Sequence, residues 1–445
     1  MEDTICAIST AVGVGGISII RVSGNNSIKL VNSIFKGKDL TKVDTNTINY
    51  GHIIYNDEII DEVLISIMRA PKTYTKEDIV EINSHGGIAV TNKILEILLT
   101  IGCREAEPGE FTKRAFLNGR IDLVEAESVI DVINAETENA RSLSVNNLTG
   151  KLSNIIKEVK QELLSLEANI EVNIDYPEYE DIEDITNEKA IIALKKITDK
   201  FDKLIEESKS GKIIKNGLDV AIIGAPNVGK SSILNALLEE NKAIVTDIEG
   251  TTRDIVEGRI ILNGIMINFI DTAGIRETKD VVEKIGVDKS LEKLDEADLV
   301  ILVLDGSRPL KEEEKELLNK VKTKNHIIFI NKNDLNKKIN IEGISGNAKE
   351  TNGLDDLKKA IIKELELNTN INKDMTYISN ARQLSLIKKA DNSLKKALKG
   401  LQDNIPVDVI TIDIESAKNN LGEILGENYK DDLLDELFSR FCIGK

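Results

Sequence analysis

The chain has 445 residues, 41% hydrophobic and 30% charged, and no apolar run of about eighteen residues, which predicts a globular protein and excludes a membrane span. Its formal net charge is −18, and the segment 121–215 alone holds 21 acidic residues against 12 basic ones. Because such a surface repels phosphodiester backbones, we expect the basic surface for any nucleic acid partner to belong largely to another subunit.

The cysteines and the first residues bear on where the protein works. The cysteines are Cys6, Cys103 and Cys442, and their odd number and wide spacing argue against a disulfide framework or a zinc site. The acidic start, Met1 to Thr4, lacks the basic and apolar regions of a signal peptide. We therefore expect a cytoplasmic protein.

The length predicts about three domains, and the first of them is α+β. Residues 1–119 combine one helical run with several short β-like runs. The helical run is 90–99, and the β-like runs are 17–22, 48–54, 63–68 and 79–82.

The rest of the chain alternates between two patterns. From 120 to 215, and again from 374 to 445, apolar residues recur every three or four positions, as in amphipathic helices. Residues 216–373 instead alternate apolar strands with helical stretches, as in a parallel sheet covered on both faces. Because a domain with neighbouring termini can be inserted into another, we expect one discontinuous all-α domain interrupted by an α/β domain.

A phosphate-binding loop stands at the start of the α/β domain. Residues 224–231 match GxxxxGK[ST] between an apolar strand and a helical stretch, as a P-loop requires. Backbone amides there can cradle phosphates, Lys230 can reach the β and γ oxygens, and the Ser231 hydroxyl suits Mg²⁺. The loop alone leaves ATP and GTP open. The nucleotide-binding residues predicted here are Asn227, Val228, Gly229, Lys230, Ser231 and Ser232.

The identity of the base follows from a second motif. Residues 331–334 read Asn-Lys-Asn-Asp directly after a strand-like run, about 100 residues beyond the phosphate loop. The Asp334 carboxylate can accept from guanine N1 and its exocyclic amine, and adenine offers no such pair of donors. The predicted base-site residues are Asn331, Lys332 and Asp334, with Asn347, Ala348 and Lys349 where GTPases usually have Ser-Ala-Lys.

Two further motifs suit the parts of a GTPase that respond to the γ-phosphate. Asp271, Thr272, Ala273 and Gly274 follow a strand, so that Asp271 can reach Mg²⁺ through water and the Gly274 amide can sense the γ-phosphate. Upstream lies a threonine-rich segment, in which Thr252 is our choice for Mg²⁺. Its predicted GTP-binding residues are Thr246, Asp247, Ile248, Glu249, Gly250, Thr251 and Thr252.

The residue after Gly274 argues against a Ras-like mechanism. Ras-like enzymes place a glutamine there to orient the attacking water, and an isoleucine, Ile275, cannot do so. The nearby alternatives are Arg276, Glu277 and Glu283, and an arginine from a second copy or an activating protein, or a bound cation, could also contribute. Spacing alone leaves this choice open.

Taken with the ends of the chain, these motifs resemble the MnmE (TrmE) family of bacterial tRNA-modification GTPases. The resemblance covers nearly the whole chain and is most specific at residues 108–120, Pro-Gly-Glu-Phe-Thr-Lys-Arg-Ala-Phe-Leu-Asn-Gly-Arg, and at the terminal 441–445, Phe-Cys-Ile-Gly-Lys. Residues 246–254 also match the family pattern TDIxGTTRD. The resemblance implies a homodimer with an N-terminal folate-binding domain, a discontinuous helical domain and an inserted GTPase domain.

The resemblance also implies ligands and catalytic roles for residues of this sequence. The GTPase domains would meet across GTP and trap K⁺, which stands in for an arginine finger, while the water-orienting carboxylate would be Glu283. Mg²⁺ ligands would be Ser231 and Thr252, and K⁺ ligands Asn227, Thr246, Ile248 and Thr251. A 5-formyl-tetrahydrofolate-type one-carbon donor would be bound by Arg21, Glu81, Arg120 and Lys445.

Three functions are compatible with these features. The leading hypothesis, from the resemblance, is a GTP-driven complex that adds an aminomethyl or carboxymethylaminomethyl group to C5 of the tRNA wobble uridine, with an MnmG (GidA) subunit carrying FAD and using NADH in a heterotetramer. A regulatory GTPase switch is the second, and the third, a stand-alone folate aminomethyltransferase, would leave the whole GTPase domain without a purpose. Cys442 could serve as a nucleophile or simply pack near the terminus.

Overall fold

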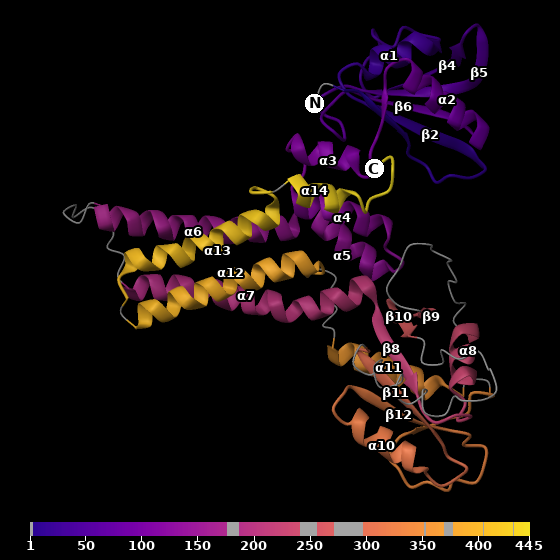
Figure 1. Ribbon diagram of the computed structural model, residues 1–445, viewed down its shortest axis with the longest axis vertical. Helices are drawn as coiled ribbons and strands as arrows, with labels where there is room; N and C mark the ends of the chain where they lie inside the picture. The colour runs from indigo at the N-terminus through magenta and orange to yellow at the C-terminus, as the bar shows by residue number, and fades with distance from the viewer. Residues whose placement is uncertain are drawn as a thin grey trace. The chain divides into compact units, whose positions relative to one another are not determined.

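The computed structural model describes residues 3–175, 187–240, 256–270, 297–350, 353–368, 377–403, 405–429 and 431–445 (Figure 1). The chain divides into two compact units. Unit 1 comprises Met1–Ile130, Leu148–Ala168 and Glu415–Lys445, and unit 2 comprises Asp131–Asn147 and Asn169–Ile414. Within the described ranges, no helix combines the length and the apolar character needed to cross a bilayer.

The core of unit 1 is a mixed sheet with the strand order β3-β4-β5-β6-β2-β1-β7. Its strands are β1 (Ile5–Ile8), β2 (Gly15–Ser23), β3 (Phe35–Lys36), β4 (Thr47–Tyr55), β5 (Glu58–Met68), β6 (Ile79–Gly86) and β7 (Arg104–Glu105). Three helices accompany them, α1 (Ser27–Ile34), α2 (Ile88–Thr100) and α3 (Glu110–Leu117). The predicted α+β character of this region is confirmed.

The two faces of this sheet are covered differently. Apolar residues of α1 and α2 share a buried core with alternate residues of the strands, such as Ile20, Ile65 and Ile82. Successive strand residues point to opposite faces, so Arg21 of β2 and Glu81 of β6, which pair in register, lie on the other face. This second face is covered near β1, where Ile5 and Ala7 share a buried core with Phe111 of α3, and it is exposed at β4 and β5.

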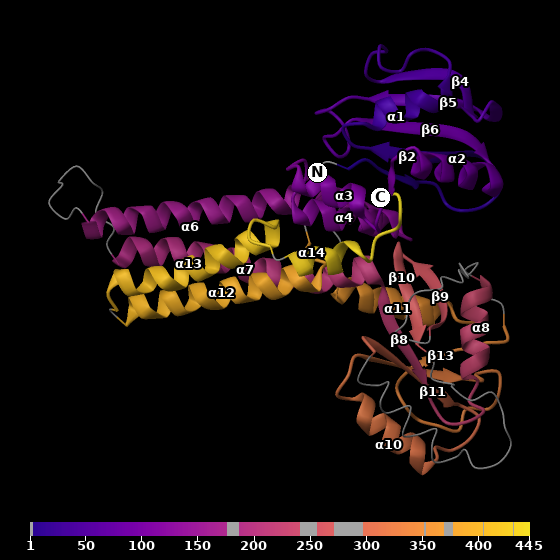
Figure 2. The ribbon, with the colours of Figure 1, turned by 45° about the horizontal axis from the view of Figure 1, so that its top comes forward.

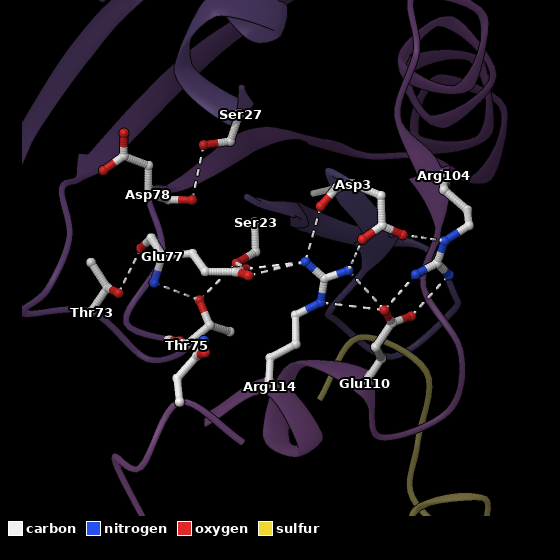
Figure 3. Close-up of polar contacts among 11 residues, drawn as sticks. Asp3, Ser23, Ser27, Thr73, Thr75, Glu77, Asp78, Arg104, Glu110 and Arg114 are labelled. Atoms are coloured by element: carbon white, nitrogen blue, oxygen red, sulfur yellow. Dashed lines mark hydrogen bonds and ion pairs between the residues drawn. The ribbon is translucent and has the colours of Figure 1, made fainter. Parts of the chain in front are cut away.

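A buried network of charges fixes α3 at the edge of this sheet (Figure 3). The Arg114 side chain is completely buried, and its guanidinium donates to Glu77 at 3.1 Å, to Glu110 at 2.9 Å and to Asp3 at 2.8 Å. Glu110 also accepts from Arg104 at 2.5 Å. Because every charge in the network has a partner of opposite sign, burial of the guanidinium is compensated.

Breaking this network should destabilise the fold strongly. Replacing Arg114 with leucine leaves Glu77 buried without its counter-charge and leaves Glu110 with Arg104 alone, and we expect the free energy of unfolding to fall by about 3–5 kcal/mol. Urea denaturation of the full chain measures this loss. The matched control is Arg141→Leu, which removes an exposed pair with Glu138 and should leave the free energy of unfolding nearly unchanged. Equal costs for the two variants would contradict this account of Arg114.

The same network gives the stability a dependence on pH. Burial alone would raise the pKa of Glu110, but hydrogen bonds from Arg104, from the Glu107 amide and from Arg114 outweigh it and hold the pKa below its ordinary value of 4.5. A carboxyl with a depressed pKa in the fold stabilises above its unfolded pKa, and that contribution disappears as the pH falls through the folded value. The free energy of unfolding should therefore decline as the pH falls below 4.5. The decline should be steeper in the unmodified protein than in Arg114→Leu.

In each unit, a helix that precedes the α/β domain in the sequence contacts a helix that follows it. In unit 1, Lys418 of α13 (Val407–Leu425) pairs with Glu167 of α6 (Lys151–Asp175). In unit 2, α7 (Asn187–Asn216) and α12 (Ala381–Gln402) run side by side (Figure 1), joined by Lys395 and Asp202 at 2.6 Å. The remaining helices of this region are α4 (Leu123–Ile133), α5 (Glu138–Leu148) and α14 (Asp431–Phe438).

The α/β part of unit 2 is a sheet in the order β13-β12-β11-β8-β10-β9, parallel except for the β9–β10 pair. Its strands are β8 (Leu218–Ile223), β9 (Val256–Leu262), β10 (Ile265–Ile270), β11 (Leu299–Asp305), β12 (His326–Asn331) and β13 (Ile344–Ser345), and its helices are α8 (Lys230–Glu240), α10 (Glu312–Val321) and α11 (Asp355–Asn368). One face packs on α8 and α11 and the other on α10 (Figure 2). The α/β domain inserted between helical segments is confirmed.

Candidate functional site

The phosphate loop connects β8 to α8, and its glycines are required by close contacts. Gly224 has a φ of 153°, and a Cβ there would lie 2.4 Å from the Val303 carbonyl oxygen. Gly229 has a φ of 101°, and its Cβ would lie 2.2 Å from the Asn331 amide nitrogen. Residues that have a side chain rarely adopt such φ values, and a side chain here would also collide with these neighbours. The two glycines therefore allow the loop to approach β11 and the base motif.

Lys230 begins α8 and turns back over the loop. Its ammonium donates to the carbonyl oxygens of Gly224 at 2.9 Å and Ala225 at 3.0 Å. Burial lowers the pKa of Lys230, since the charged form loses hydration there. Ser231 and Ser232 follow in the first turn of the helix. A buried ammonium, a helix N-terminus and a loop rich in backbone amides together form an anion-binding site. The oxygen of the Ser231 hydroxyl is a ligand suited to Mg²⁺.

Asn331 joins the three loops that sequence reasoning assigned to the nucleotide. Its amide nitrogen donates to the Val228 carbonyl oxygen at 2.8 Å, and its amide oxygen accepts from the Ala348 backbone at 3.4 Å. Asn347 closes its own turn by accepting from the Lys349 amide at 3.1 Å. Asp334, the last residue of the motif 331–334, is exposed to solvent. The structure thus brings the phosphate loop, residues 331–334 and residues 347–349 together.

Lys332 makes a contact that the sequence analysis missed. Its ammonium lies 2.6 Å from the Asp305 carboxylate and 3.2 Å from the Asn227 carbonyl oxygen. Burial acts to raise the pKa of Asp305, but hydrogen bonds from Lys332 and Ser307 outweigh it and lower that pKa. The sequence did hold a signal for Asp305, which directly follows the apolar run 299–304. In a parallel sheet ligands bind at the carboxyl ends of the strands, so an aspartate at such an end is a candidate site residue.

Several predicted site residues lie outside the described part of the chain. They are Thr246, Asp247, Ile248, Glu249, Gly250, Thr251, Thr252, Asp271, Thr272, Ala273, Gly274 and Glu283. In the chain, the first segment precedes β9 and the second follows β10 directly. Of the residues assigned to metals by resemblance, Ser231 and Asn227 are described. Among the residues that are described, no three His, Cys, Asp or Glu side chains gather as a metal-binding group.

A second cluster of predicted residues lies in unit 1. The Arg21 guanidinium contacts the Glu81 carboxylate at 2.9 Å and donates to the Gly444 carbonyl oxygen at 3.3 Å. Ser9 donates to the same oxygen at 3.0 Å. Burial, and then the charge of Arg21, lower the pKa of the half-buried Lys445, while Glu81 opposes them. The C-terminus is thereby held against β2 and β6, and two cations lie close together.

Aromatic rings complete this cluster, and sequence reasoning did not find them. The Tyr74 ring lies 4.5 Å from the Arg120 guanidinium and 5.7 Å from that of Arg21, measured to the ring centroid. The Phe111 ring lies 5.6 Å from Arg21. Nothing in the sequence around Tyr74 marks it as functional. Three cations and two rings can together bind a planar molecule that carries carboxylates.

Cys442 stands beside this cluster without a thiol partner among the described contacts. It is a free, exposed cysteine, and its carbonyl oxygen accepts from the Gly109 amide at 3.3 Å. The structure therefore presents an exposed thiol near the C-terminus and not a side chain packed in a core. His85 of β6 lies apart from this thiol in its contacts: its Nδ1 is 2.7 Å from the carboxylate of Asp61 on β5.

The parallel sheet, the phosphate loop before α8 and the base loop after β12 define a P-loop GTPase. Residues 4–120 match the model for the GTP-binding protein TrmE N-terminus, and residues 123–442 match that for the MnmE helical domain. The tRNA modification GTPase MnmE of Bacillus cytotoxicus is 49% identical over 100% of this chain and 99% of its own, and that of Streptococcus thermophilus is 51% identical over 100% and 98%. The chain belongs to the MnmE family.

Proposed function

We propose that GTP hydrolysis by this chain drives the addition of an aminomethyl or carboxymethylaminomethyl group to C5 of the wobble uridine in tRNA. Two features of one chain support this reaction over a simple GTPase switch. The guanine-nucleotide site provides the hydrolysis, and the cluster of Arg21, Arg120 and Lys445 with Tyr74 provides a separate place for a cofactor. The relatives named tRNA modification GTPase match this chain along its full length.

The proposed division of labour follows the domains expected from the sequence. We assign residues 1–119 to a folate-binding domain, 216–373 to the GTPase domain, and 120–215 with 374–445 to the helical domain. Helices that contact each other from both sides of the insertion, such as α7 and α12, suit a scaffold that carries motion away from the GTPase domain. The cofactor would supply one carbon at the first domain.

The cluster in unit 1 suits a 5-formyl-tetrahydrofolate-type donor. Such a molecule combines a flat ring system with a glutamate tail that carries two carboxylates. Arg21, Arg120 and Lys445 offer the positive charges for the carboxylates, and the Tyr74 ring offers an aromatic face. Glu81 can accept from amino groups of the ring system. The Lys445 ammonium, whose pKa is lowered by burial and by Arg21, is stabilised when an anion joins the cluster.

Arg21→Met should weaken binding of 5-formyl-tetrahydrofolate by about tenfold or more, since it removes a charged hydrogen-bond donor from a partly buried site. Isothermal titration of the full chain measures the dissociation constant. The control is Lys93→Met, which removes an exposed cation paired with Glu96 on α2 and should leave the affinity unchanged. Absence of folate binding by the unmodified protein would favour the regulatory-switch function instead.

Homodimer formation is part of the proposal, and the part of the unit 1 sheet that is exposed at β4 and β5 supports it. Tyr50 of β4 and Leu64 of β5 pair in register, and their side chains are 60% and 45% exposed. Ile48, also on β4, is 69% exposed. Apolar side chains gathered on one face are typical of an interaction surface. The same face carries Arg21 and Glu81, so a second copy seated there would shield the folate site.

The proposed active state binds Mg²⁺ through Ser231 and Thr252 and K⁺ through Asn227, Thr246, Ile248 and Thr251. The described members suit these roles: Ser231 offers a hydroxyl at the start of α8, and Asn227 offers an exposed amide side chain on the loop. When bound, K⁺ supplies positive charge beside the transferring phosphoryl group.

The proposed partners are the FAD-dependent MnmG (GidA) subunit, which uses NADH, and tRNA held mainly by that subunit in the cytoplasm. The strongly acidic helical segment 121–215 suits docking of a basic protein surface better than direct contact with tRNA. Both subunits would form a heterotetramer.

Nucleoside analysis of bulk tRNA tests the function directly. We expect deletion of the gene to remove the C5-modified wobble uridines, a plasmid copy of the natural sequence to restore them, and a Lys230→Ala copy to fail. Unchanged nucleosides in the deletion strain would refute the proposal. Restoration by Lys230→Ala would show that GTP hydrolysis is not needed for it.

A further inference from the structure

Asp305 occupies a position that connects the base loop to the phosphate loop. It is the last residue of β11, and in the sheet it pairs in register with Asn331, the last residue of β12. Its side chain is 7% exposed, and one carboxylate oxygen lies 2.6 Å from the Lys332 ammonium. That ammonium also donates to the Asn227 carbonyl oxygen in the phosphate loop, at 3.2 Å. A chain of contacts thus runs from β11 through Lys332 to the phosphate loop.

The other carboxylate oxygen of Asp305 holds the aspartate itself in place. It accepts from the Ser307 hydroxyl at 2.6 Å and from the Ser307 amide at 3.0 Å. The two oxygens therefore face different groups: one faces its own turn, and the other faces Lys332 at 2.6 Å and, more distantly, the Arg308 guanidinium at 3.8 Å. Gly306 adds a backbone hydrogen bond to the Asn331 carbonyl oxygen at 3.0 Å, which holds the turn against the base loop.

Lys332 needs such a partner because it is held in an unusual place. Its φ is 63°, in the left-handed region that non-glycine residues seldom adopt. Its side chain is one-third exposed and has many rotamers, so an unpaired lysine would lose considerable freedom when a nucleotide orders the loop. A buried carboxylate that fixes the ammonium beforehand removes this cost from nucleotide binding.

We propose that Asp305 is a positioning residue for guanine-nucleotide binding, which holds Lys332 against Asn227 so that the base loop and the phosphate loop keep their spacing. This inference rests on the nucleotide site and adds a residue to it. Asp305 would not touch the nucleotide. It would act through Lys332, and its effect should appear in nucleotide affinity and not in the hydrolysis step.

The test is Asp305→Asn, which keeps the shape of the side chain and its acceptor for Ser307 but removes the charge that faces Lys332. We expect the dissociation constants for GDP and GTP to rise about tenfold or more, with KM for GTP rising in parallel and kcat at saturating GTP unchanged. Displacement of a fluorescent GDP analogue from the full chain gives the affinities. Asp305→Glu, which keeps the charge, should bind more tightly than Asp305→Asn.

Two comparisons separate positioning from general structural damage. Glu312→Gln breaks an exposed ion pair with Lys315, 2.6 Å long on the nearby helix α10, and should leave nucleotide affinity unchanged. In a Lys332→Met background, adding Asp305→Asn should change the affinity by no more than about twofold, because the contact it acts through is already gone. Thermal unfolding of each variant confirms that it is folded.

The possible results are distinct. Wild-type affinity in Asp305→Asn, equal losses with asparagine and glutamate, or full additivity with Lys332→Met would each overturn the role of Asp305. Failure of the unmodified protein to bind the GDP analogue would overturn the nucleotide site itself, and this inference with it. Tight GDP binding without tRNA modification would contradict the proposed function and leave the role of Asp305 intact.

Discussion

Glu283→Ala should lower kcat for GTP hydrolysis by about a hundredfold or more and leave the affinity for GTP near that of the unmodified protein. The reason is the residue after Gly274, because Ile275 cannot orient the attacking water and another group must do so. We propose the Glu283 carboxylate for that task. An interaction made only in the transition state changes kcat without changing ground-state binding.

Single-turnover hydrolysis together with equilibrium binding of a non-hydrolysable GTP analogue measures both quantities. The matched control is Glu277→Ala, which removes a carboxylate from the same stretch of chain and should retain turnover. Equal loss of GTP binding and turnover in Glu283→Ala would indicate structural damage. Loss of turnover in Glu277→Ala alone would assign the role to Glu277.

Replacing K⁺ by Na⁺ in the assay should slow hydrolysis by about a hundredfold or more. A cation that supplies charge beside the transferring phosphoryl group takes the place of an arginine finger, whose removal has effects of about this size or larger. Ion radius decides which cation the ligand set holds, so Na⁺ at the same concentration tests the site without changing ionic strength.

Asn227→Ala extends this test to one residue of the phosphate loop. If the Asn227 side chain helps to hold the ion, the variant should hydrolyse GTP slowly in both salts while still binding GDP. Equal rates of the unmodified protein in K⁺ and Na⁺ would refute the cation-dependent mechanism. A variant that remained stimulated by K⁺ would remove Asn227 from the ligand set.

The fold was readable from the sequence where periodicity and motif spacing agree. The alternating apolar runs of residues 216–373 predicted the parallel sheet, and the phosphate-loop and base motifs predicted residues of one nucleotide site. In the structure Asn331 contacts Val228 and Ala348, so these residues lie close together. Local patterns carry this information because each motif sits at the end of its own strand.

The last turns of α7 are helical for a physical reason. Residues 209–216 are mostly polar in sequence, yet the structure continues α7 to Asn216. Ile214 is buried there, and a Cβ at Gly211 would lie 2.8 Å from the Ile378 carbonyl oxygen. Tertiary packing of this face against residues after the GTPase domain keeps the helix intact, and such packing is invisible in a local polarity pattern.

The second cluster could not be derived from spacing. Arg21 and Gly444 are 423 positions apart and yet share a hydrogen bond, so their proximity exists only in the fold. Arg21, Glu81, Arg120 and Lys445 were identified by resemblance, while the rings of Tyr74 and Phe111 that face them were not. The same holds for Asp305, whose partner Lys332 lies on the neighbouring strand end.

The most direct test of the central claim is reconstitution of the reaction with purified components. The full chain, the flavin-containing subunit with FAD and NADH, a tetrahydrofolate one-carbon donor, K⁺, Mg²⁺ and unmodified tRNA are combined with GTP or with a non-hydrolysable analogue, and the wobble nucleoside is identified by mass spectrometry. We predict C5-modified uridine with GTP and none with the analogue or without the folate. Equal modification in the absence of GTP hydrolysis, or no modification with every component present, would contradict the account.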